Sequence, residues 1–256
     1  MQNGSTYNKR FEKPLIRLRY TVPNSFTALS LLLGVASIVT TQIGELELAA
    51  WFIVWCGLLD VMDGLSARLL KATSDFGAEF DSMADLVAFG VAPAVLMLNA
   101  GLQIADIEVG SEQFWVLLVA IGVFALAGAM RLARFNLYSD QPSTGWFAGV
   151  PITAAGGGII PSVILVLIYH PDIAASLPLR LYLPVLVFVL ALLMISRIRF
   201  PKAVKRDNLF INIFQATVVA SVYYCGITRS YPEFLLAVGT FVLVSGIIAG
   251  RITLLS

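Results

Sequence analysis

The chain has 256 residues, of which 58% are hydrophobic and only 13% are charged, and its mean hydropathy is +0.85. Soluble domains of this length do not have such a composition, so the sequence predicts an integral membrane protein with little mass outside the bilayer. The formal net charge is +1, which gives no electrostatic reason to expect a nucleic acid as partner, and we expect none.

The first 22 residues carry five basic side chains but no apolar core followed by a small-residue cleavage site. They are therefore not a secretory signal peptide. We expect residues 1–22 to form a cytoplasmic basic segment that leads into an interfacial helix. Residues 23–256 are expected to form a single transmembrane domain, because no linker is long enough to separate a second one.

A helix needs about 20 mostly apolar residues to cross a bilayer. We expect eight such helices, at about 24–43, 47–68, 79–99, 113–134, 150–169, 180–196, 209–227 and 233–252. The third is the least apolar, since it contains Glu79, Asp81 and Asp85. The predicted fold is an all-α polytopic bundle of about eight transmembrane helices.

The basic residues predict the orientation of this bundle. Of the 17 Lys and Arg residues, 15 fall on the side that holds the N-terminus, and only Arg180 and Arg229 fall on the other. The positive-inside rule then places both termini in the cytoplasm, with the protein in the inner membrane of the cell.

The most informative segment is residues 60–85, where two pairs of aspartates interrupt apolar helices. Asp60 and Asp63 lie about one turn apart, as do Asp81 and Asp85, so each pair shares a helix face. Charge at membrane depth costs several kcal/mol or more and needs compensation. Hard carboxylate oxygens suit magnesium, manganese or calcium, so we expect a site for divalent cations facing the cytoplasm.

Small residues accompany the carboxylates. Gly64 and Ala67 follow the first pair at helical spacing, and Gly77 shares a stripe with the second, so a ligand or another backbone can approach closely. Arg68 offers a fixed cation suited to phosphate. This combination indicates a diphosphate site with two cations. The alternatives are that the aspartates pair with nearby basic residues, or that they form the site of a divalent-cation transporter, which would typically lie nearer mid-membrane.

The stretch Asp60-x-x-Asp63-Gly64-x-x-Ala67-Arg68, with Gly77-x-x-x-Asp81-x-x-x-Asp85, resembles the signature of the CDP-alcohol phosphatidyltransferases. The resemblance implies a core of six transmembrane helices, here with two more, usually in a homodimer. It implies two divalent metal ions, Mg²⁺ or Mn²⁺, held by Asp60, Asp63, Asp81 and Asp85. Asp85 would also be the general base. The CDP-linked lipid would be bound by Asp60, Gly64, Ala67, Arg68 and Gly77.

The segment Pro23-Asn24-Ser25-Phe26-Thr27 resembles the P-N-x-x-T entry of the same family, which is associated with the cytidine. Asn24 and Thr27 lie on one helix face and offer an amide and a hydroxyl group. They are therefore expected to contribute to CDP-lipid binding. A plain helix start is the alternative interpretation of this segment.

The segment from Arg131 to Asn136 reads R-L-A-R-F-N and resembles the serine-using members of the family in bacteria and archaea. Two further segments, Phe147-x-Gly149-Val150-Pro151 and residues 196–202, resemble them too. The resemblance implies that Arg131, Arg134, Asn136 and Arg197 bind the acceptor or a phosphate. The alternative for the arginines is that they anchor the helix ends at the cytoplasmic surface.

The implied reaction is the metal-assisted, direct transfer of the phosphatidyl group of CDP-diacylglycerol to the hydroxyl of L-serine, which gives phosphatidylserine and CMP. Glycerol 3-phosphate or inositol as acceptor stays an alternative. Substrate and product imply contact with membrane lipids. Gly156, Gly157 and Gly158 lie inside an apolar segment without a following lysine, so we expect them to serve helix packing rather than phosphate binding.

Overall fold

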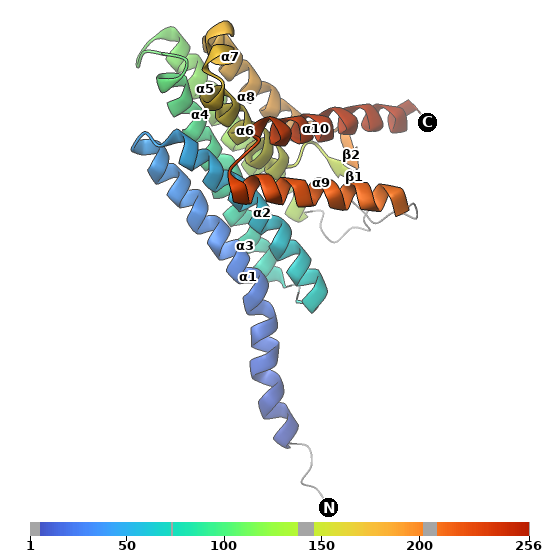
Figure 1. Ribbon diagram of the computed structural model, residues 1–256. Helices are drawn as coiled ribbons and strands as arrows, with labels where there is room; N and C mark the ends of the chain where they lie inside the picture. Colours follow the sequence, from blue (N-terminus) through green and yellow to red (C-terminus); the bar gives the residue numbers. More distant parts are fainter. Residues whose placement is uncertain (1–5, 73, 138–145, 202–208, 256) are drawn as a thin grey trace, which may run out of the picture.

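The computed structural model describes residues 6–72, 74–137, 146–201 and 209–255, and these are mostly helical (Figure 1). The longer helices are α1 (Thr6–Gln42), α2 (Leu46–Leu70), α5 (Glu112–Leu137), α9 (Leu209–Thr228) and α10 (Pro232–Leu255). The shorter ones are α3 (Asp75–Asp85), α4 (Ala92–Gln103), α6 (Ile160–Tyr169), α7 (Pro171–Ser176) and α8 (Leu179–Ile195). Two π-helical segments, η1 (Leu86–Val91) and η2 (Thr153–Ile159), lead into α4 and α6.

All eight ranges expected as membrane spans fall on helices. Four helices of the described chain are long and apolar enough to cross a membrane: Tyr20–Gln42, Leu46–Leu70, Asp75–Gln103 and Glu112–Leu137. Three shorter helices are also apolar: Thr153–Tyr169, Leu179–Ile195 and Pro232–Ile248. The helices are those of a multi-pass membrane protein, while the count of eight spans and the cytoplasmic termini stay predictions.

The first helix runs without interruption through the expected boundary at residue 22. It covers Thr6–Gln42, which corresponds to a length of about 55 Å, whereas the hydrocarbon core of a bilayer is about 30 Å thick. In Figure 1 the N-terminal part of α1 projects beyond the rest of the protein. From Thr6 onwards, the basic segment and the first apolar span are therefore parts of one continuous helix, and the interfacial position of the basic segment stays a prediction.

The expected α-helical fold is confirmed, with one short pair of strands in addition. Strands β1 (Trp146–Ala148) and β2 (Arg199–Pro201) form a short antiparallel pair, in which Phe147 is opposite Phe200. The neighbouring Gly149 has a φ of +77°, and its N–H donates to the carbonyl of Ile198 over 2.8 Å. A Cβ at this position would overlap the carbonyl oxygen of Met194, so only glycine allows this approach.

The packed interior joins α2, α4, α5, α6 and α8 with the two π-helical segments. Phe89 of η1 is fully buried and lies against η2. A Cβ on Gly156 would overlap the Phe89 carbonyl oxygen, and one on Gly157 would lie 2.8 Å from the Phe89 ring. Gly156 and Gly157 therefore serve close packing, as expected from the sequence.

The last two helices are arranged differently from the others. In Figure 1, α9 and α10 lie side by side and run across the direction of the helices that precede them. Helix α9 contacts α2, while α10 contacts η2, α6 and β2. This α9–α10 hairpin therefore covers the side of the bundle formed by α2 and η2.

Candidate active site

The site is built where the C-terminal end of α2 faces α3 and α1. After α2, Lys71 adopts the left-handed conformation, with a φ of 51°, and the Ala72 N–H donates to the Ala67 carbonyl over 2.9 Å. This C-cap ends the helix and reverses the chain. Ser74 then caps α3, because its Oγ accepts a hydrogen bond from the Gly77 N–H over 3.0 Å. The two caps place the aspartates of α2 opposite those of α3.

Three of the four aspartates come together at this place: Asp60 and Asp63 of α2 and Asp81 of α3. Oxygen atoms of Asp60, Asp63 and Asp81 all lie within 4.8 Å of one another. Asp85 lies beside Asp60, and Asp81 lies beside Asp63. Asp63 is the most buried, with 7% of its surface exposed. Carboxylates this close repel each other unless a cation or a proton lies between them.

The donor set suits hard divalent cations. It consists of carboxylate oxygens, which Mg²⁺, Mn²⁺ and Ca²⁺ prefer over nitrogen or sulfur. The salt bridges among the described residues, Arg180–Asp106 and His170–Glu233, include none of the four aspartates. Among the described residues, these carboxylates are therefore not neutralised through salt bridges, although the charge of Arg131 acts on Asp85. The residues are consistent with a metal site.

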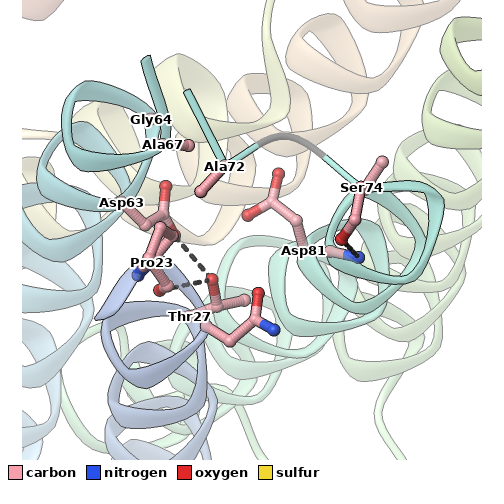
Figure 2. Close-up of a pocket in the computed structure, with 11 residues that line it drawn as sticks. Pro23, Thr27, Asp63, Gly64, Ala67, Ala72, Ser74 and Asp81 are labelled. Carbon is pink, nitrogen blue, oxygen red and sulfur yellow. Dashed lines mark hydrogen bonds between the residues drawn. The ribbon is translucent and has the colours of Figure 1, made fainter. Parts of the chain in front are cut away.

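A cavity of about 170 Å³ adjoins the carboxylates (Figure 2). It is lined by Pro23, Asn24, Thr27, Asp63, Gly64, Ala67, Ala72, Ser74, Gly77, Ala78 and Asp81. Seven of these were expected to bind the CDP-linked lipid or its metal ions. Figure 2 shows Thr27 between Asp63 and Asp81, and the Thr27 hydroxyl donates to Oδ2 of Asp63 over 3.0 Å. We call this space the nucleotide cavity, after the sequence expectation that Asn24 and Thr27 contribute to binding of the CDP-linked lipid.

Small residues keep the nucleotide cavity open. A Cβ on Gly77 would lie 3.1 Å from Ser74 Oγ and 3.3 Å from Asn24 Oδ1, so glycine leaves these polar atoms room. A Cβ on Gly64 would have Arg68 Nη2 as its nearest neighbour, at 3.7 Å. The sequence interpretation did not include Ser74, although a serine before a helix and three residues before Gly77 is a recognisable N-cap.

Three of the expected residues lie elsewhere around the site. Asp60 lines a second, apolar cavity rather than the nucleotide cavity. Arg68 is exposed, and its Nε donates to the carbonyl of Gly64 over 3.0 Å. Arg197 is exposed between α8 and β2, and is not among the described residues that line either cavity.

The end of α5 contributes a buried cation. Arg131 is only 8% exposed and lies close enough to Asp85 for their charges to interact. Its Nε is the one buried side-chain polar atom of the described residues without a hydrogen-bond partner. Buried donors are nearly always satisfied in native proteins, so this N–H is available to an acceptor group of a ligand or to an ordered water.

The other two expected residues of α5 contact neighbouring helices. The Arg134 guanidinium donates to the carbonyl oxygens of Met194 and Ile195, each over 3.4 Å, at the end of α8. Asn136 accepts a hydrogen bond from Ser82 over 3.1 Å and donates to Glu79 over 3.4 Å. Both side chains therefore tie α5 to helices around the site.

Comparison with known proteins agrees with this geometry. The model of the CDP-alcohol phosphatidyltransferase family matches residues 20–195. The chain belongs to this family. As a CDP-alcohol phosphatidyltransferase it is an enzyme, and the aspartates, the nucleotide cavity and Arg131 all fall within the matched range. Helices α9 and α10 follow after it.

Several curated relatives of this phosphatidyltransferase carry the name CDP-diacylglycerol–serine O-phosphatidyltransferase. The one from Helicobacter pylori (strain ATCC 700392 / 26695) is 38% identical over 182 residues, which cover 71% of this chain and 72% of the relative. The one from Methanocaldococcus jannaschii is 32% identical over 207 residues, covering 81% and 86%. The one from Bacillus subtilis is 33% identical over 180 residues, covering 70% and 89%.

Proposed function

We propose that this protein transfers the phosphatidyl group of CDP-diacylglycerol to the hydroxyl of L-serine, with phosphatidylserine and CMP as products. The observation that carries the proposal is the juxtaposition of the cluster of Asp60, Asp63 and Asp81, a cavity lined by small residues, and a buried arginine with an unsatisfied donor. The names of the relatives support serine as acceptor.

The nucleotide cavity is the proposed place of the CDP group. Asn24 offers an amide at its wall, and Gly64, Ala67 and Gly77 leave space for the cytidine and diphosphate. Arg68 lies at the exposed end of α2, where its guanidinium can bind phosphate from the cytoplasmic side. The chain thereby holds the leaving group in place while the acceptor approaches.

Asp60, Asp63, Asp81 and Asp85 would hold two divalent cations, Mg²⁺ or Mn²⁺. When bound, these ions would offset the negative charge of the diphosphate and of the leaving CMP. The Thr27 hydrogen bond holds Asp63 in one orientation.

Asp85 is the proposed general base. It accepts the proton of the serine hydroxyl while the serine oxygen forms its bond to the phosphorus that carries diacylglycerol. The bond from that phosphorus to the CMP oxygen breaks, and CMP leaves with the electron pair. No covalent intermediate with the protein is needed in this scheme.

Arg131 is the proposed ligand of the serine carboxylate. Its positive charge and its unpartnered Nε suit the carboxylate of serine. Because Arg131 lies near Asp85, serine bound there would have its hydroxyl close to the proposed base. Arg134 and Asn136 are proposed to support this end of α5 through their contacts with α8 and α3.

We propose further that the site opens to the cytoplasm at the inner membrane and that the protein works as a homodimer. The orientation is supported by 15 of the 17 basic residues lying on one side of the expected spans. CDP-diacylglycerol would then reach the site from the inner leaflet and serine from the cytosol.

The proposal is tested with purified protein in detergent, CDP-diacylglycerol and Mn²⁺ or Mg²⁺. CMP release is followed with serine, glycerol 3-phosphate, inositol or no acceptor, each with and without a chelator. Serine-dependent release that the chelator abolishes is expected. CMP release that depends on another acceptor would refute serine as the acceptor, while the proposed phosphatidyl transfer would still hold.

A further inference from the structure

A second cavity, of about 370 Å³, opens beside Asp60. Asp60 is its one charged residue, and hydroxyl groups come from Thr153, Ser162 and Tyr223, while the remaining lining residues are apolar. The volume lies in the range of small-molecule sites, about 300–1,000 Å³. The cavity is therefore large, mostly apolar and in direct contact with the carboxylate cluster.

One wall of this cavity comes from the α9–α10 hairpin. Its residues are Val218, Val219, Val222 and Tyr223 of α9 and Leu235, Val238, Gly239 and Val242 of α10. The opposite walls come from α2, η2 and α6. The hairpin lies beyond residue 195, where the match to the family ends, so this cavity is completed by helices outside the matched core.

The hairpin is fixed against the core by specific contacts. The Tyr223 hydroxyl donates to the Leu58 carbonyl over 2.6 Å, and the Trp55 Nε1 donates to the Gly226 carbonyl over 2.7 Å. On α10, a Cβ at Gly239 would lie 3.3 Å from Cγ1 of Ile159, so the helix packs closely against η2. These contacts make α9 and α10 a defined wall rather than a loose cover.

We propose that this cavity, here called the acyl pocket, takes one acyl chain of the CDP-linked lipid and that the α9–α10 hairpin exists to form its wall. The inference rests on the proposed function. In that reaction the phosphate under attack is joined to a glycerol that carries acyl chains. Asp60 belongs to the cluster that acts on this phosphate and also lines the acyl pocket, so the pocket continues the site in the direction of the lipid.

The acyl pocket is expected to position the lipid for the reaction rather than to increase the affinity of the enzyme for it. Lipid tails are as apolar as the pocket wall, so moving a chain from the bilayer into the pocket gains little from the hydrophobic effect. A chain held between α2 and the hairpin would, however, fix the glycerol phosphate relative to the carboxylates, and correct placement of reacting groups has a large effect on rate.

The test fills the pocket from two opposite walls. Gly57 on α2 lines the pocket, and nothing lies within 4 Å of an added Cβ, so Gly57→Leu projects into open space. Val238→Phe adds bulk from α10. The matched control is Gly122→Leu on an exposed face of α5, where an added Cβ also meets nothing within 4 Å. Melting temperature and elution in gel filtration establish that each variant is folded.

The readout is the ratio of kcat/KM for dioleoyl to that for dihexanoyl CDP-diacylglycerol, whose chains are too short to fill the pocket. Both pocket variants are expected to lower this ratio by about tenfold or more, and the control to leave it unchanged. An unchanged ratio in both pocket variants would overturn the inference, as would an equal loss on both lipids. If the unaltered protein released CMP from neither lipid, the proposed function itself would fail, which is a distinguishable result.

Discussion

The Thr27 hydroxyl donates a hydrogen bond to Oδ2 of Asp63 over 3.0 Å, and this bond links α1 to the carboxylate cluster between α2 and α3. Both side chains are buried. A neutral donor beside a ligand carboxylate fixes its orientation without competing for the cation. The entry segment of the first span therefore acts on the proposed metal site as well as on the nucleotide cavity.

Thr27→Val should weaken metal binding. The substitution keeps the shape of the side chain but removes the donor to Asp63, and the loss of such supporting bonds typically costs about 10–100-fold in metal affinity. The measurement is activity against Mn²⁺ concentration. Thr40→Val is the matched control, because the Thr40 hydroxyl bonds only carbonyls of its own helix, at Ala36 and Ser37. A metal dependence shifted equally in both variants would contradict this role.

Asp85→Asn should remove turnover and keep the fold. The amide preserves the size of the side chain but cannot accept the serine proton, and general-base catalysis contributes about 10²–10⁴-fold. Single-turnover CMP release measures the effect, with thermal melting as the check on folding. Asp75→Asn, on the exposed first turn of the same helix, should retain activity. Activity of Asp85→Asn close to that of the unaltered protein would exclude Asp85 as the base.

Arg131→Lys should raise the KM for serine. Lysine keeps the positive charge but loses the fork of donors that includes the unpartnered Nε, and hydrogen bonds to charged groups are worth about tenfold to a hundredfold in binding. The KM for CDP-diacylglycerol should change little. Equal changes in both KM values would instead place Arg131 at a lipid phosphate.

Arg134→Lys is the companion variant. The Arg134 guanidinium donates hydrogen bonds to the carbonyls of Met194 and Ile195, so the substitution should loosen the contact of α5 with α8. We expect a lower melting temperature and a smaller effect on the KM for serine than in Arg131→Lys. A larger increase in the KM for serine in Arg134→Lys than in Arg131→Lys would instead indicate that Arg134 binds the serine carboxylate.

Gly64→Leu should obstruct the nucleotide cavity. Its added Cβ has open space up to Arg68 Nη2 at 3.7 Å, so the new side chain extends into the cavity without a backbone clash. The KM for CDP-diacylglycerol and the inhibition constant for CMP should both rise by about tenfold or more, while the KM for serine stays constant. Unaltered inhibition by CMP would place the cytidine elsewhere.

Hydropathy and spacing were enough to predict the helices and that the aspartates of residues 60–85 would gather at one place. Each of the eight expected ranges falls on a helix, and the one-turn spacing of the aspartates placed each pair on one face. The packing role of Gly156 and Gly157 was also predictable, because no lysine follows the run. These features depend on local periodicity, which the sequence carries directly.

The contacts between elements could not be predicted in the same way. The approach of Asp81 to Asp60 and Asp63 depends on the turn at Lys71 and on the packing of α1 against both α2 and α3. The π-helical segments and the β1–β2 pair arise from tertiary packing around Phe89 and Gly149. Hydropathy shows that α9 and α10 are apolar, but not that they run across the bundle or complete a cavity.

The most direct measurement is the incorporation of labelled serine into lipid by the purified protein with CDP-diacylglycerol and Mn²⁺. We expect label in phosphatidylserine, one equivalent for each CMP released, and none with a chelator or in Asp81→Asn. Release of CMP without labelled lipid, or labelling that persists after the chelator and in the variant, would contradict serine transfer at the aspartate cluster.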